Sequence, residues 1–90
     1  MSTPTDTFLH NELREELAKI LNTSVDQLPG DVTPQIAGKF LSTSPRTLSI
    51  WRCTGRYNLS FYKAGSKVRY PVPSLVRFKY SRIHKHTRGI

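Results

Sequence analysis

The sequence predicts a small domain of the α+β class that is mostly α-helical, and three observations support this prediction. Apolar residues recur at three- and four-residue steps in several segments, which is the spacing of helices that bury one face. Apolar and polar residues instead alternate on both sides of Ala64-Gly65-Ser66, which is the pattern of a β-hairpin. The chain has 90 residues, enough for one domain with a modest core.

The first helix is expected from Thr7 to about residue 22, with Asp6 or Thr7 as its cap. Its apolar stripe consists of Phe8, Leu9, Leu13, Leu17, Ile20 and Leu21. This stripe either packs on the rest of the chain or contacts a second copy or a partner protein. The second alternative is plausible because the acidic outer face of the helix can meet the basic half of another subunit. The candidate residues for self-association are Leu9, Leu13 and Leu17.

Residues 24–27 have the spacing of a capping box and predict one short helical turn, with Leu28 as its apolar anchor. Pro29-Gly30-Asp31 then predicts a turn or hinge. Residues 1–31 are therefore expected to form an acidic N-terminal extension that contains one amphipathic helix.

Two short helices with a tight turn between them are expected in residues 33–52. Each begins with a residue that caps helices, followed by proline at the first helical position: Thr33-Pro34 and Ser44-Pro45. Leu48 and Trp51 face inward from the second helix. The residues left mostly outside are Arg46, Thr47, Ser49, Ile50 and Arg52. This is the pattern of a helix-turn-helix, in which the second helix enters the major groove of DNA.

A β-hairpin is expected after Gly55, which suits a left-handed helix end. Its strands lie near residues 59–62 and 67–70, and Lys63 and Lys67 flank its tip. A hairpin with a basic tip that directly follows such a helix is a wing, and it favours contact with the DNA backbone or the minor groove.

The last helix is expected from Ser74 to about residue 83. Its buried residues are predicted to be Leu75, Val76, Phe78 and Ile83, and its water-facing residues Arg77, Lys79 and Arg82. Residues 32–83 then form the DNA-binding domain, and residues 84–90 a basic tail.

Charge is divided unequally along the chain, whose net charge is +8. All six acidic residues lie in residues 1–31, which carry only two basic ones. From Val32 onward there are twelve Lys and Arg residues and no Asp or Glu. Such a segment repels itself unless a polyanion neutralises it, and duplex DNA carries about one charge per 1.7 Å of its axis. Nucleic acid is therefore the expected partner.

Several other kinds of function lack the residues they need. One cysteine, Cys53, allows no internal disulfide and fits a reducing cytoplasm. No apolar run approaches the roughly 20 residues of a membrane span, and the N-terminus lacks the pattern of a signal peptide. His10, His84 and His86 do not form a metal-ligand pattern. No phosphate-binding loop or catalytic triad is evident, so we expect no enzyme, no cofactor and no metal.

Residues 33–41, 44–52 and 54–70 together resemble the small winged helix-turn-helix proteins of the excisionase type. These recombination directionality factors are related to the DNA-binding domains of MerR-like regulators. The matching residues are Ser44-Pro45-Arg46-Thr47-Leu48 with Trp51, Thr54-Gly55-Arg56-Tyr57-Asn58-Leu59, Tyr62-Lys63 with Gly65, Lys67-Val68-Arg69-Tyr70, Leu75 and Phe78. The family usually has Gly in place of Ser42 and often Pro in place of Ser60, and its pattern does not include the first thirty residues.

The resemblance implies a winged helix-turn-helix with a two-stranded wing, to which this chain adds an N-terminal helix. The base contacts it implies are Arg46, Thr47, Ser49 and Ile50. Arginine can bind guanine through two hydrogen bonds, and isoleucine can contact the thymine methyl group. The implied phosphate and wing contacts are Arg52, Arg56, Lys63, Ser66, Lys67 and Arg69.

The implied function is that of an excisionase, which does no chemistry itself. Such a protein binds repeated sites cooperatively and bends attachment DNA, so that a partner integrase (a tyrosine or serine recombinase) cuts in the direction of excision. A small transcriptional regulator that binds promoter operators is an alternative of the same class. A phage assembly adaptor that resembles a terminase small subunit is an alternative of another class. The expected location is the cytoplasm of a bacterial or phage-infected cell, on the nucleoid.

Overall fold

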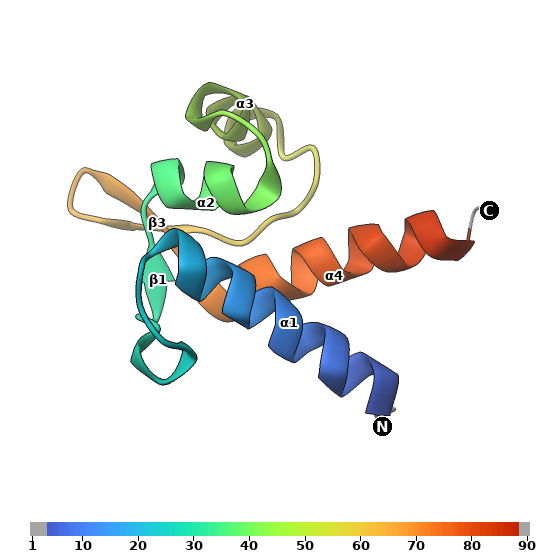
Figure 1. The fold of residues 1–90 in the computed structure, drawn as a ribbon. Helices are drawn as coiled ribbons and strands as arrows, with labels where there is room; N and C mark the ends of the chain where they lie inside the picture. Colours follow the sequence, from blue (N-terminus) through green and yellow to red (C-terminus); the bar gives the residue numbers. More distant parts are fainter. Residues whose placement is uncertain (1–3, 89–90) are drawn as a thin grey trace.

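The structure is a computed structural model that describes the backbone of residues 4–88 and the side chains of residues 8–83. The helices of this described part are α1 (Pro4–Ile20), the 3-10 turn η1 (Val25–Gln27), α2 (Pro34–Leu41), α3 (Pro45–Thr54) and α4 (Val72–Arg88). Its strands are β1 (Asp31–Val32), β2 (Tyr62–Ala64) and β3 (Lys67–Pro71), which form one antiparallel sheet in the order β1-β3-β2. The prediction of a mostly helical α+β domain is confirmed (Figure 1).

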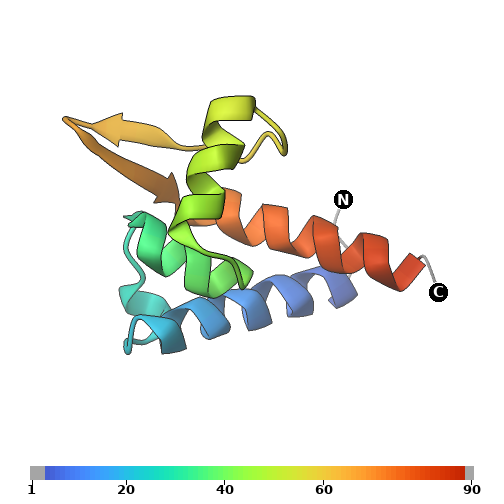
Figure 2. The same cartoon turned by 90° about the horizontal axis from the view of Figure 1, so that it is seen from above.

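The helices are stacked so that α3 lies at the outside of the molecule. α1 and α4 pack against each other, and α2 packs on both of them. α3 in turn packs on α2, on the side away from α1 (Figures 1 and 2). The hairpin of β2 and β3 projects from this helical body with its tip free in solvent.

One hydrophobic core joins all of these layers. The largest side chains that are less than 2% exposed are Leu17 of α1, Phe40 of α2, Leu48 of α3, Tyr70 of β3 and Leu75 of α4. Burying an aliphatic or aromatic side chain of this size stabilises a fold by about 1.5–3 kcal/mol. Because α1 supplies part of this core, it is an integral layer of the domain.

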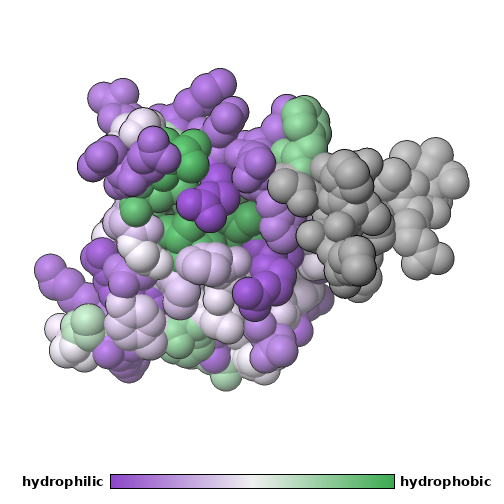
Figure 3. All heavy atoms as spheres, turned by 90° about the horizontal axis from the view of Figure 1, so that it is seen from below, coloured by the Kyte–Doolittle hydropathy of each residue, from purple (hydrophilic) through white to green (hydrophobic). Residues whose placement is uncertain are grey.

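Two of the three leucines predicted for self-association are instead core residues. Leu13 and Leu17 are only 4% and 0% exposed, so they are not available to a second copy while the chain is folded. Leu9 is half-buried and lines a groove with Ile83, bordered by acidic residues of α1. Figure 3 shows the side of the molecule opposite α3, where apolar side chains gather in one area among hydrophilic ones.

The capping signals of α2 and α3 are confirmed. The Thr33 hydroxyl accepts a hydrogen bond from the Ile36 backbone N–H at 3.3 Å, and the Ser44 hydroxyl accepts one from the Thr47 N–H at 3.1 Å. Between the helices, Ser42 adopts the left-handed conformation with φ 58°. A short polar residue therefore occupies a left-handed turn position, a conformation that glycine adopts most easily.

The N-terminal elements differ from the prediction in detail. α1 begins at Pro4, so the backbone of Asp6 and Thr7 is helical and neither residue is a cap. The short turn η1 forms where expected, but the Ser24 side chain makes no capping hydrogen bond. Its carbonyl accepts a bond from the Gln27 N–H at 3.0 Å instead.

The sheet contains a strand that was not predicted. Asp31 was expected to belong to a turn. It instead begins β1 and pairs with Pro71 of β3. β2 begins at Tyr62, so the predicted strand at 59–62 starts three residues too early. The predicted position of the hairpin tip is confirmed. Ala64 pairs with Lys67, so Gly65 (φ 68°) and Ser66 form the turn.

The last helix is longer than predicted at both ends. α4 begins at Val72, directly after β3, where the Val72 N–H donates to the Gly30 carbonyl at 2.9 Å. It continues through Arg88, so most of the predicted basic tail at 84–90 is helical, and its last two residues lie outside the described residues. Leu75 and Val76 are buried as predicted, and Phe78 and Ile83 are half-buried.

Lys79 was predicted to face water, and this prediction is wrong. Its Nζ lies 3.0 Å from a carboxylate oxygen of Glu16, 2.5 Å from the Phe40 carbonyl and 4.5 Å from the centre of the Phe40 ring. The ammonium group thus ties α4 to α1 and to the C-terminal end of α2, where a positive charge is favourable. Its partners are distant in sequence, so the local pattern around Lys79 could not indicate them.

Gly38 allows the turn between α2 and α3 to approach α2 closely. A Cβ atom at this position would lie 2.6 Å from the Thr43 carbonyl oxygen. The Thr43 N–H also donates to the Gly38 carbonyl at 2.8 Å, so the turn lies directly against α2 here. A glycine inside a helix costs about 1 kcal/mol relative to alanine, and here the close approach requires it.

We expect Gly38→Ala to lower the free energy of unfolding by about 1–3 kcal/mol, because the added methyl group displaces the turn. Urea unfolding followed by circular dichroism measures this change. Gly30→Ala is the matched control, since a Cβ there meets nothing within 4 Å. A Gly38→Ala variant as stable as the wild type would contradict this account of the turn.

Candidate nucleic-acid interface

The outer face of α3 carries the four residues predicted to contact bases. Arg46 is exposed and Ile50, one helical turn later, is 51% exposed. Thr47 and Ser49 are half-buried at the borders of this face, and the Thr47 hydroxyl accepts a hydrogen bond from the Ser44 hydroxyl at 3.0 Å. Leu48, on the opposite side of the helix, is completely buried. The core therefore fixes which face of α3 is presented to solvent.

The tip of the hairpin presents the predicted wing residues. Lys63, Ser66 and Lys67 are all exposed, and they surround the left-handed Gly65. The hairpin extends from the body beside α3, so its basic tip and the outer face of α3 can both meet one extended ligand (Figures 1 and 2).

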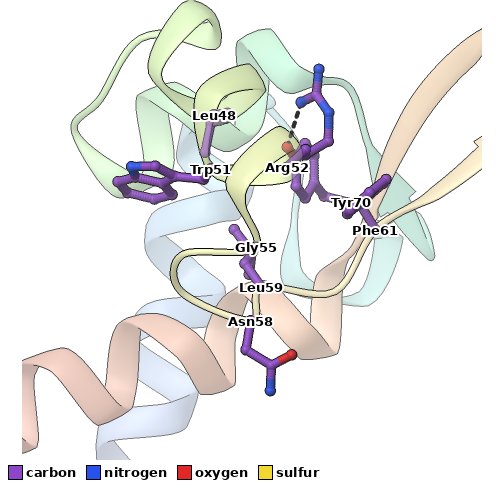
Figure 4. A pocket seen from close by; sticks show the side chains of 8 residues that line it. All are labelled: Leu48, Trp51, Arg52, Gly55, Asn58, Leu59, Phe61 and Tyr70. Atoms are coloured by element: carbon purple, nitrogen blue, oxygen red, sulfur yellow. Dashed lines mark hydrogen bonds between the residues drawn. The ribbon is translucent and has the colours of Figure 1, made fainter.

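The base of the hairpin is attached to α3 by Arg52, which was predicted to contact phosphate. Its Nη1 donates to the Tyr70 hydroxyl at 2.6 Å, and its guanidinium carbon lies 5.8 Å from the Phe61 ring centre and 5.9 Å from that of Tyr70 (Figure 4). These groups line a cavity of about 130 Å³ between α3, the loop that follows it and β3. Through these contacts Arg52 positions the hairpin relative to α3, and its predicted phosphate contact stays a prediction.

A second attachment joins the hairpin to β1. Arg69 of β3 lies opposite Tyr62 of β2, and both side chains contact the Asp31 carboxylate. The Arg69 Nε donates to Asp31 at 2.9 Å, and the Tyr62 hydroxyl donates to the same carboxylate. Arg69 was predicted to contact phosphate, but its ion pair directs it toward the protein. Sequence reasoning missed Tyr62 and Asp31, because their pairing depends on the unpredicted strand β1.

The pKa values of this pair shift in opposite directions. The hydrogen bond from Tyr62, followed by that from Arg69, favours the ionised carboxylate and lowers the pKa of Asp31. The same bond to Asp31 favours the neutral phenol and raises the pKa of Tyr62. At neutral pH the Asp31 carboxylate is therefore charged and holds both strands of the hairpin.

Arg56 lies at the other end of the interface, directly after α3. It is exposed, as predicted, and its guanidinium carbon lies 5.4 Å from the centre of the Tyr57 ring. Arg56 forms no ion pair within the described residues, so it is available to bind a ligand from solvent.

The acidic residues of α1 lie apart from the exposed basic residues of α3 and of the hairpin tip. Among the described side chains, ion pairs engage only Arg69 and Lys79 of the basic residues. Arg46 of α3 and Lys63 and Lys67 of the hairpin tip therefore face solvent without carboxylate partners in this part of the chain. The acidic Glu12, Glu15 and Glu16 lie on α1, and α2 separates α1 from α3 (Figure 1).

Comparisons of the chain with protein-family models, with curated proteins and with solved structures find no match. Within the described residues, no three or more His, Cys, Asp or Glu side chains are grouped as a metal site would need. No helix in the same part of the chain has the length and apolar character needed to cross a membrane. Cys53 is exposed near the end of α3.

We expect the wild type to lose stability more steeply than Asp31→Asn when the pH falls from 6 to 2. Because the pKa of Asp31 is lowered by folding, its stabilising effect is complete above the unfolded value of about 3.9 and is lost as the pH falls through the lower folded value. Urea unfolding across this range measures the difference. Asp26→Asn, at an exposed position, is the control. If the difference in the free energy of unfolding between the wild type and Asp31→Asn stayed constant down to pH 2, this account would be refuted.

Proposed function

We propose that this chain is a sequence-selective duplex DNA-binding protein of the winged helix-turn-helix type. In this proposal α3 enters the major groove and the β2–β3 hairpin contacts the adjacent backbone or minor groove. One observation carries it: Arg46 of α3 and Lys63 and Lys67 of the hairpin tip are exposed and have no carboxylate partner in the described structure, and the acidic residues of α1 lie beyond α2. A surface sorted in this way attracts a polyanion and orients it.

Selectivity would come from the outer face of α3. Arg46 can donate two hydrogen bonds to guanine, and the exposed Ile50 can contact the methyl group of thymine one helical turn away. Thr47 and Ser49 border the same face, and their hydroxyl groups can bind either base edges or phosphates. An exposed isoleucine on a basic helix is favourable once a ligand with an apolar group covers it.

Phosphate contacts would come from exposed residues on both sides of this face. Lys63, Ser66 and Lys67 belong to the hairpin tip, and Arg56 follows α3. Arg52 and Arg69 would support these contacts indirectly, because their bonds to Tyr70 and Asp31 fix the hairpin against α3 and β1. A wing held in place before binding loses less entropy when DNA binds.

The biological role we propose is that of an excisionase. The support is the family resemblance of residues 33–70, the separation of charge and the lack of recognisable catalytic residues in the sequence. The protein would bend attachment DNA and assist a partner integrase without doing chemistry, and neighbouring copies would bind cooperatively. Since Leu13 and Leu17 are buried, a contact between copies through α1 would use its exposed acidic side or Leu9 at its groove.

Arg46→Ala and Lys67→Ala are expected to weaken DNA binding in different ways. Loss of Arg46 should cost about 1–3 kcal/mol and relax selectivity at one base pair. Loss of Lys67 should weaken all duplexes similarly and lower the slope of log Kd against log salt by about one. Fluorescence anisotropy with duplexes selected from a random pool measures both effects, with Lys19→Ala on α1 as the control. Equal, sequence-independent losses from both variants would rule out the assigned orientation of α3.

The role is tested by footprinting the protein on DNA fragments from its own source. Several adjacent protected repeats beside an attachment site or an integrase gene are the expected result. A single protected operator at a promoter would replace the excisionase role with that of a transcriptional regulator. Protection without any sequence preference would refute the base contacts of α3.

A further inference from the structure

A second basic surface lies on the side of α3 away from the hairpin. The loop between α3 and β2 and the first half of α4 form a groove there, lined by residues 57–60 and by Ser74, Arg77 and Phe78. In Figures 1 and 2 this loop and the hairpin lie on opposite sides of α3. Neither Arg77 nor Arg82 of α4 belongs to the contacts assigned above.

The groove is built on a fixed aromatic cluster. Tyr57 of the loop packs edge-on against Trp51 of α3, with ring centres 4.6 Å apart, and Phe78 of α4 lies 6.1 Å from Trp51 and 6.3 Å from Tyr57. These three rings join the end of α3, the loop and α4. The loop is therefore held in place although it contains no helix or strand.

Two arginines lie over the same ring of this cluster. The guanidinium carbon of Arg82 is 4.9 Å from the Tyr57 ring centre, and that of Arg56 is 5.4 Å from it. Arg82 also lies 5.7 Å from the Phe78 ring centre. A contact of this kind with a ring leaves guanidinium N–H groups that can still donate hydrogen bonds to an anion.

No carboxylate in the described residues balances these charges. The ion pairs of that part of the chain engage Arg69 and Lys79, so Arg56, Arg77 and Arg82 have no acidic partner there. Several positive charges without acidic partners raise the local positive potential, which favours binding of an anion. Arg77 is exposed at the adjacent edge of the groove, where the Ser74 side chain also lines it.

We propose that this groove binds the phosphate backbone of duplex DNA beside the site contacted by α3. The inference rests on the proposed function and extends it: the hairpin would hold the backbone on one side of α3, and Arg56, Arg77 and Arg82 would hold it on the other. The hairpin and the loop that lines the groove lie on opposite sides of α3, so each can meet a different part of the same duplex. Arg77 and Arg82 are thus assigned as phosphate-binding residues.

The test is the double variant Arg77→Gln/Arg82→Gln, measured on a duplex that carries the selected site. We expect the slope of log Kd against log salt to fall by about one for each arginine removed, while the preference for the selected site over random duplex is unchanged. The footprint of the variant should lose protection at one end only, the end away from the hairpin. Arg14→Gln/Lys19→Gln on α1 is the matched control, because both residues are exposed and it changes the net charge equally.

The outcomes separate this inference from the proposed function. If the double variant matches its control in slope and in footprint, while Lys67→Ala still lowers the slope, the groove does not bind DNA and the inference fails alone. If the wild type does not bind duplex DNA, or binds duplex RNA more tightly, the proposed function fails with it. Circular dichroism verifies folding, and Arg77→Gln alone provides the same test if loss of the Arg82 stack unfolds the chain.

Discussion

The arrangement of the proposed interface depends on Tyr70. Its ring is 1% exposed in the core, its backbone in β3 pairs with Val32 of β1, and its hydroxyl accepts a hydrogen bond from Arg52 of α3. One side chain thus connects the core, the hairpin and the helix that would contact DNA. The ion pair of Asp31 with Arg69, the residue before Tyr70 on β3, holds the same hairpin from the opposite face of the sheet. Without these two attachments the hairpin would be a two-stranded ribbon, which is marginally stable alone.

Features with a local cause could be predicted from the sequence. The starts of α2 and α3 depend on a hydroxyl and a proline within a few residues, so Thr33 and Ser44 identified them correctly. The turn at Gly65 and the helix end at Gly55 depend on a glycine with positive φ, which is also local. The helical stripe of α1 was likewise evident, although its start at Pro4 was not.

Features that depend on distant partners could not be predicted. β1 has two residues and exists because β3 pairs with it, so no periodicity indicates it. Arg52 and Arg69 look like free surface charges in the sequence, but their partners lie 18 and 38 residues away. The same reason explains Lys79, whose contacts with α1 and α2 appear only when α4 is packed. The contacts of Arg52 and Arg69 give the hairpin a rigid base, and those of Lys79 hold α4 against α1 and α2.

The central claim is that α3 and the hairpin tip form one surface for duplex DNA. The most direct measurement is an NMR titration of the labelled protein with its selected duplex, following the backbone amides. The account predicts that the shifts concentrate in residues 46–50 and 63–67, with α1 little affected. Shifts concentrated on α1, or spread evenly over the chain, would contradict it.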